Sequence, residues 1–121
     1  MNAEERKREF KRRTKEFDGS IVRFYISLDK RREELRIPGK QLIRFDTSVA
    51  AKYREASRAR SDAEFIAKIE LCAFEADEAQ LWLELLRDDC NIDPNSTEPI
   101  WKEADELISI FVTISKNTKN K

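Results

Sequence analysis

Positively charged side chains are the residues of this chain best suited to bind a partner. One group lies in the first fifteen residues, and a second lies at 52–60, where Tyr53 stands among the cations. Lys and Arg neutralise phosphates, which gives nucleic-acid affinity that depends on salt and little on base sequence. The candidate RNA or DNA contacts are Arg12, Arg13, Lys52, Arg54, Arg58 and Arg60. Glu residues among the N-terminal cations reduce the net positive charge of that segment. The alternative to a nucleic-acid contact is therefore an ordinary helix face exposed to solvent.

Enzyme chemistry has few candidate groups in this sequence. The chain contains no His, which removes the commonest metal ligand and the commonest general base. Glu70, Asp77 and Glu84 recur in steps of seven, but each lies two positions before an apolar residue, so this face points to solvent. Only two Gly residues are present, far apart, which excludes a phosphate-binding loop. We expect no catalytic residue, metal, cofactor or small-molecule substrate.

The two cysteines indicate a reducing environment. Cys72 occupies an apolar helical position, which is typical of a buried thiol, and Cys90 lies near a helix C-terminus, where the dipole disfavours a thiolate. They form no CxxC motif. The first 20 residues are mostly charged, and no apolar run approaches the roughly 20 residues that cross a bilayer. These features predict a cytoplasmic protein with no membrane partner.

Four amphipathic helices must position these residues. Apolar side chains recur at alternating steps of three and four, which places one stripe along each helix. The helices are predicted at about 3–30, 39–58, 61–89 and 98–115, and the stripe of the second includes Phe45. Gly19 costs about 1 kcal/mol relative to Ala, yet the first stripe continues in phase across it, so we expect one helix there.

Several polar residues and prolines predict where the helices begin and end. Ser61-Asp62-Ala63-Glu64 is a capping box, in which Ser61 accepts from the third amide and Glu64 reaches back. Pro38 and Gly39 mark the entry to the second helix, and Ser96 or Thr97 caps the fourth, with Pro99 in its first turn. The polar tail at 116–121 is expected to fray.

The number and length of these helices indicate the fold class. The 121 residues suffice for one domain, 1–121, and hold only 2 Gly and 3 Pro, too few for the many turns of a β-sandwich. Short connections make neighbouring helices antiparallel. The sequence therefore predicts an all-α protein, an antiparallel up-down-up-down four-helix bundle.

Opposite charges are divided between the two halves of the chain. Residues 1–60 hold 18 Lys and Arg and 10 Asp and Glu, a net +8, while residues 61–121 hold 6 and 14, a net −8. Three uses fit this asymmetry. Basic helices can lie against acidic helices of the same chain, a basic face can meet the acidic face of a second copy, or the basic half can meet nucleic acid.

The helices also carry more apolar residues than one seam of a monomeric bundle needs. The additional residues include Val22, Ile26, Leu81 and Val112. Exposed apolar patches usually mark an interface, whereas a broad stripe can also fill a thick core. The candidate subunit-interface residues are Tyr25, Ile66, Trp82, Leu85 and Trp101.

The central stretch, 39–86, resembles a family of bacterial four-helix-bundle proteins. The matching pieces include Gln41-Leu42-Ile43-Arg44, Tyr53-Arg54-Glu55-Ala56 and Trp82-Leu83-Glu84-Leu85-Leu86. In these pieces the chain resembles the proteins encoded in intervening sequences of 23S ribosomal RNA genes. It is also similar to the accessory variability protein of diversity-generating retroelements.

The resemblance implies an antiparallel bundle that assembles as a ring, commonly a pentamer. For the retroelement protein it also implies nucleic-acid binding through a basic surface, whereas the biochemical role of the intervening-sequence proteins is not established. We therefore expect a non-catalytic homo-oligomer, whose partners are further copies of itself. The alternative is an accessory protein that binds RNA or DNA. In a ring, the basic face of one copy can meet the acidic face of the next.

Overall fold

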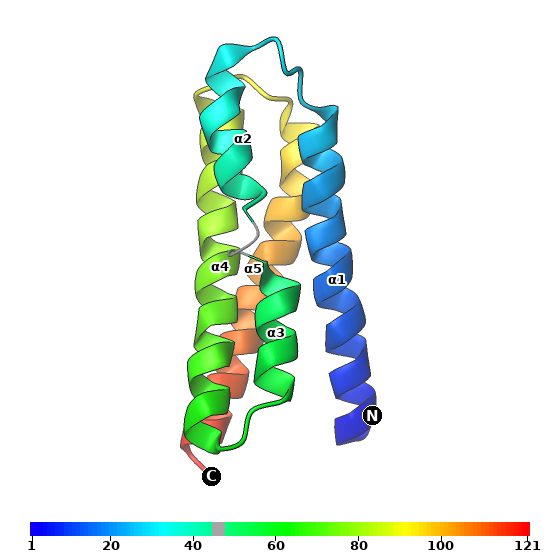
Figure 1. The fold of residues 1–121 in the computed structure, drawn as a ribbon, viewed down its shortest axis with the longest axis vertical. Helices are drawn as coiled ribbons and strands as arrows, with labels where there is room; N and C mark the ends of the chain where they lie inside the picture. Colours follow the sequence, from blue (N-terminus) through cyan, green and yellow to red (C-terminus); the bar gives the residue numbers. More distant parts are fainter. Residues whose placement is uncertain (45–47) are drawn as a thin grey trace.

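The computed structural model describes residues 1–44 and 48–121 and shows a helical protein (Figure 1). Its α-helices are α1 (Ala3–Ser27), α2 (Arg36–Leu42), α3 (Val49–Ser57), α4 (Asp62–Asp88) and α5 (Pro94–Lys119). A short 3-10 turn, η1 (Glu33–Leu35), precedes α2. The described residues form no strand, and the predicted all-α class is confirmed.

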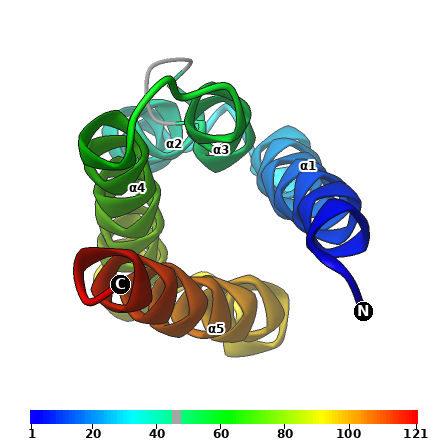
Figure 2. The same cartoon turned by 90° about the horizontal axis from the view of Figure 1, so that it is seen from below.

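The helices form an antiparallel bundle with four positions. In Figure 1, α1 runs in one direction, α2 and α3 return in series, α4 runs parallel to α1, and α5 returns again. Figure 2 shows α1 and α4 at opposite corners, with α3 between them on one side and α5 on the other. The predicted up-down-up-down bundle is confirmed, with α2 and α3 together occupying one of its four positions.

The interior consists of the apolar stripes that the sequence predicts. Phe17 on α1, Leu83 on α4 and Phe111 on α5 are almost completely buried, as is Thr14, whose hydroxyl donates to the carbonyl of Phe10 at 2.7 Å. Helix α1 passes through Gly19 without a break, as predicted. Burial of these stripes is the main source of helix stability, because isolated helices are only marginally stable in water.

The start of α4 follows the predicted cap. The Ser61 hydroxyl accepts from the backbone N–H of Glu64 at 3.1 Å, and α4 begins at Asp62. The Glu64 carboxylate accepts from the backbone N–H of Arg60 at 3.2 Å. In a reciprocal capping box it would accept from the N–H of the N-cap residue itself, Ser61. Local sequence is therefore sufficient to set this boundary.

The prediction of one helix over 39–58 is wrong. Helix α2 begins earlier, at Arg36, and ends at Leu42, and α3 begins separately at Val49 after the N-cap Ser48. Ser48 accepts from the backbone N–H of Ala51 at 3.0 Å, which satisfies an amide at the start of α3. Phe45, assigned to the stripe of that helix, lies outside the described residues.

The start of α3 is also held by Asp18 of α1. The Asp18 carboxylate accepts from the Ser48 hydroxyl at 2.6 Å and from the backbone N–H of Ala50 at 3.0 Å. Burial raises the pKa of Asp18 above its ordinary value, while these hydrogen bonds lower it. A residue from another helix therefore helps to hold the start of α3.

Two further helix ends differ from the prediction. Helix α1 ends at Ser27 rather than near residue 30, and the ammonium of Lys30 folds back to the carbonyl of Leu28 at 2.9 Å. Helix α5 begins at Pro94, not near residue 98, because Asp93 supplies the cap and accepts from the N–H of Asn95 at 3.0 Å. Pro99 therefore lies inside this helix.

The tail that was expected to fray from residue 116 is helical as far as Lys119. The Thr118 hydroxyl donates to the carbonyl of Ile114 at 2.8 Å, and the Lys119 ammonium lies 2.7 Å from the Glu70 carboxylate of α4. These contacts tie the last turn to its own helix and to a neighbouring one.

Replacing Asp18 tests its role in holding α3. Asp18→Ala is expected to lower the free energy of unfolding by about 1–2 kcal/mol, because it removes an acceptor from a helix start. Urea denaturation followed by circular dichroism measures this loss. Glu16→Ala is the control, since Glu16 makes only an exposed ion pair with Arg23. An equal loss in both variants would contradict the cap.

Candidate interaction surfaces

Basic residues from two helices meet in a groove between α1 and α3. Lys15 of α1 and Arg54 and Arg58 of α3 line this α1–α3 groove, which has a volume of about 520 Å³. All three residues are exposed, and none makes an ion pair with another described residue. The structure thus brings together two of the predicted nucleic-acid contacts and adds a lysine from the N-terminal run.

The two arginines predicted on α1 are engaged with carboxylates. Arg12 pairs with Glu9 one turn earlier, with contacts of 2.6 and 3.0 Å. Arg13 makes two hydrogen bonds of 2.7 Å to Glu103 of α5 and lies 3.1 Å from Glu106. The hydrogen bonds that Arg13 donates to these α5 carboxylates raise its pKa. Arg13 therefore joins α1 to α5.

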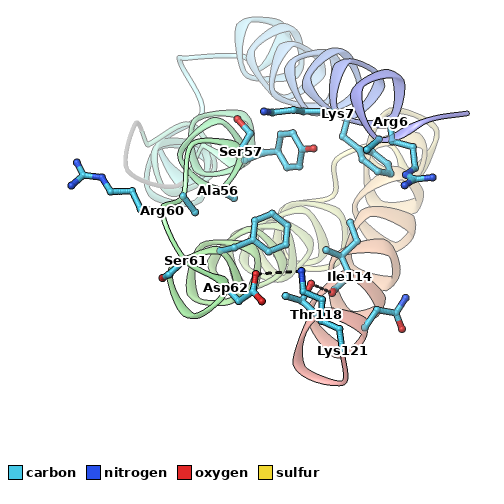
Figure 3. Close-up of a pocket in the computed structure, with 16 residues that line it drawn as sticks. Arg6, Lys7, Ala56, Ser57, Arg60, Ser61, Asp62, Ile114, Thr118 and Lys121 are labelled. Carbon is cyan, nitrogen blue, oxygen red and sulfur yellow. Dashed lines mark hydrogen bonds and ion pairs between the residues drawn. The ribbon is translucent and has the colours of Figure 1, made fainter.

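The other two predicted cations differ from Arg54 and Arg58 in their surroundings. Lys52 shares the carboxylate of Glu55 with Lys68, at 3.5 and 3.2 Å. Arg60 lies in the turn between α3 and α4, and its side chain points outward at the end of the bundle (Figure 3). The predicted set is therefore spread over several surfaces instead of forming one patch.

The five candidate interface residues are half-buried within the single chain. Tyr25, Trp82 and Trp101 pack against the core. The indole N–H of Trp101 donates to Glu84 at 2.9 Å, and the Gln80 amide donates to the carbonyl of Trp101 at 3.2 Å, which joins α4 to α5. Ile66 and Leu85 complete the set. Much of the apolar surplus thus widens the core.

A second apolar stripe runs along the side of α4 that faces away from the core, and it includes residues that the predicted interface omitted. The exposed fractions of Leu71, Phe74 and Leu81 are 39%, 55% and 48%. Together with Leu85, these residues define the α4 outer face. These residues follow one another at steps of 3, 7 and 4, which is the helical spacing of the core stripe. A prediction that assigns one apolar stripe to each helix therefore omits this second stripe.

A smaller apolar patch lies on α1. Val22 and Ile26, one turn apart, are both exposed and define the α1 patch. The α1 patch and the α4 outer face belong to helices at opposite corners of the bundle (Figure 2). The described residues therefore include two apolar patches on different helices.

Two of the three carboxylates that recur in steps of seven make separate contacts. Glu70 accepts from Lys119 and from the Ser115 hydroxyl, which lowers its pKa, and Glu84 accepts from Trp101. Asp77 is exposed. Across residues 1–44 and 48–121, no group of three or more His, Cys, Asp or Glu side chains is placed to hold a metal ion.

The thiol of Cys72 is buried, as predicted. It lies in the core, with its sulfur 4.0 Å from the carbonyl of Val49, and burial raises its pKa to about 12. Both cysteines are free thiols. Within the described part of the chain, no helix is long and apolar enough to cross a membrane.

Comparison with known proteins decides the family. The family model for the 23S rRNA-intervening sequence protein matches residues 6–113, which is most of the chain. The chain belongs to this family. Among solved structures, it is similar to a protein of unknown function from the S23 ribosomal protein family of Bacteroides thetaiotaomicron, with 33% sequence identity and a TM-score of 0.79. That similarity covers 91% of this chain and 97% of the other. No curated protein matches the chain.

The buried Cys72 thiol makes the free energy of unfolding of this protein depend on pH. The unfolded thiol ionises near 9.0 and the folded thiol near 12, so the unfolded state loses its proton first. The free energy of unfolding therefore falls as pH rises above about 9. Urea denaturation at pH 7 and pH 10 should show a smaller fall for Cys72→Ala than for the unsubstituted protein, with Cys90→Ala as the control. Equal falls in all three proteins would contradict this assignment.

Proposed function

We propose that this chain is a non-catalytic interaction protein that assembles with further copies of itself into a ring. The observation that carries the proposal is the α4 outer face, where Leu71, Phe74 and Leu81 remain exposed although the core of the bundle is already filled. Leaving such a stripe in water is unfavourable, and contiguous exposed apolar surface usually marks an interface. A neighbouring copy can bury this stripe.

The positions of the two apolar surfaces favour a ring over a two-fold dimer. In a ring, one surface of each copy meets a different surface of the next. The α4 outer face and the α1 patch are such a pair, because they lie on helices at opposite corners of the bundle (Figure 2). A two-fold dimer would join identical surfaces and leave the second one exposed.

Charge supports the same pairing. Near the α4 outer face lie the carboxylates Asp77 and Glu78, and α1 belongs to the basic half of the chain. Opposite charges beside two apolar patches steer the encounter and disfavour contact between like surfaces. Five copies is the number that the family resemblance implies, and the proposal adopts it.

Substituting Phe74 tests the ring. The unsubstituted protein is expected to have about five times the 14.3 kDa mass of one chain when gel filtration is followed by light scattering. Phe74→Glu is expected to give monomers, because a charge on the α4 outer face cannot be buried against an apolar surface without a large cost.

Ile37→Glu is the matched control, since Ile37 is an exposed apolar residue of α2 outside both patches. Circular dichroism checks that each variant remains helical. A monomeric unsubstituted protein at every concentration would contradict the ring, and a Phe74→Glu variant that stays assembled would contradict the α4 outer face as its interface.

Nucleic-acid binding is a second candidate function, favoured by the convergence of Lys15, Arg54 and Arg58 on the α1–α3 groove. These cations have no carboxylate partner among the described residues, so they can neutralise phosphates without first breaking an ion pair. The family to which the chain belongs is named for an intervening sequence of 23S rRNA, which makes RNA the natural first probe.

Filter binding to a 23S rRNA fragment at two salt concentrations tests this candidate. Arg54→Glu/Arg58→Glu is expected to weaken binding at least about tenfold at low salt and to reduce its salt dependence. Lys102→Glu on α5 is the control. No binding of the unsubstituted protein even at low salt would contradict an RNA role.

A further inference from the structure

A second, larger groove opens at the end of the bundle where α1 begins and α5 ends. This end groove has a volume of about 870 Å³ and lies between α1, the α3–α4 turn and the last turns of α5 (Figure 3). Volumes of this size are typical of small-molecule sites, which are often found between the helices of bundles. None of the interactions argued above for assembly or for RNA uses this groove.

The walls of the end groove are apolar and aromatic. Phe10 of α1, Tyr53 of α3, Phe65 of α4 and Ile114 of α5 line it, so all four positions of the bundle contribute. Phe10, Phe65 and Ile114 are only partly buried against the core, and Phe10 meets Tyr53 edge-on at 6.1 Å between ring centroids. These side chains leave apolar surface available to the body of a ligand.

A buried polar group also lines the end groove. Tyr53 is 6% exposed, and its hydroxyl makes no hydrogen bond with any other described residue. Burial raises its pKa, so the phenol stays protonated and can donate a hydrogen bond. The hydroxyl itself is not fully buried, so it can donate to a ligand in the groove that accepts a hydrogen bond.

The charged residues that line the end groove are mainly cationic. They are Arg6, Lys7, Lys121 and Arg60, whose side chain points outward, together with the carboxylate of Asp62. Lys121 lies 3.4 Å from Asp62, whereas Lys7 is half-buried and has no ion pair among the described residues. Figure 3 shows Lys7 on α1 facing the groove, opposite Ser57 of α3. This charge favours an anionic headgroup.

We propose that the end groove binds an acyl-chain carboxylate, that is, a fatty-acid anion. Its carboxylate accepts from the Tyr53 hydroxyl and pairs with the Lys7 ammonium, and its chain lies against Phe10, Phe65 and Ile114. The combination of an apolar wall, an unpartnered donor and an unpaired cation is what an amphipathic anion requires, and neither a fully polar nor a cationic ligand satisfies it.

Isothermal titration calorimetry of the full chain with decanoate, below its micelle-forming concentration, tests the proposal. Decanoate is expected to bind one per chain, whereas decyltrimethylammonium, with the same tail, and acetate, with the same headgroup, are expected to bind at least about tenfold more weakly. Equal binding of decanoate and decyltrimethylammonium, or no binding of decanoate, would overturn it.

Variants locate the site. Tyr53→Phe retains the ring and is expected to weaken decanoate binding about tenfold without lowering thermal stability, because the hydroxyl lacks a partner in the free protein. Lys7→Glu is expected to weaken binding at least as much, and Asp62→Asn to strengthen it, since that change removes a side-chain carboxylate that lines the groove. Ala59→Trp, in the α3–α4 turn, should block the groove.

Lys40→Glu, at the opposite end of the bundle, is the matched charge control and should leave decanoate binding unchanged. If Lys40→Glu and Lys7→Glu weaken binding equally, or if Tyr53→Phe has no effect, the site is not the end groove. Failure of the ring or of RNA binding would not affect these results, because they involve other residues.

Discussion

Helix α4 has apolar residues on two opposite faces, and one chain can bury only one of them. Its core face, with Ile69, Cys72 and Leu83, packs in the centre of the bundle. Its outer face remains in contact with water in the single chain. The helix therefore stabilises the bundle on one side and, on the other, leaves the exposed apolar face on which the proposed assembly rests. Both faces follow from one repeated spacing.

The charged residues of the surface divide into those that pair within the chain and those that do not. The net charges of +8 and −8 in the two halves are partly neutralised within the chain, where Arg13 of α1 joins Glu103 of α5 and Lys68 of α4 joins Glu55 of α3. The first of the three uses of the charge asymmetry, in which basic helices lie against acidic helices of the same chain, is thus partly observed. Several cations that have no carboxylate partner among the described residues line the two grooves, where they are available to anionic partners.

Local sequence patterns were sufficient to predict the bundle. They were not sufficient to predict contacts between residues that are far apart in the sequence. The stripe of α1 and the Ser61 cap of α4 involve residues within a few turns of each other, and both were predicted. The start of α3, which divides the helix predicted over 39–58, is held by Asp18, 30 residues before Ser48. The pairing of Arg13 with Glu103 spans 90 residues, so no local pattern indicates which arginines remain free.

Burial of the α4 outer face between copies is the central claim, and hydroxyl-radical footprinting measures it most directly. At a protein concentration that favours assembly, Phe74 and Leu81 should be protected from oxidation, and on dilution to the monomer their oxidation rates should rise while that of Ile37 stays the same. Oxidation rates of Phe74 and Leu81 that do not change with concentration would show that this face stays in water and would contradict the account.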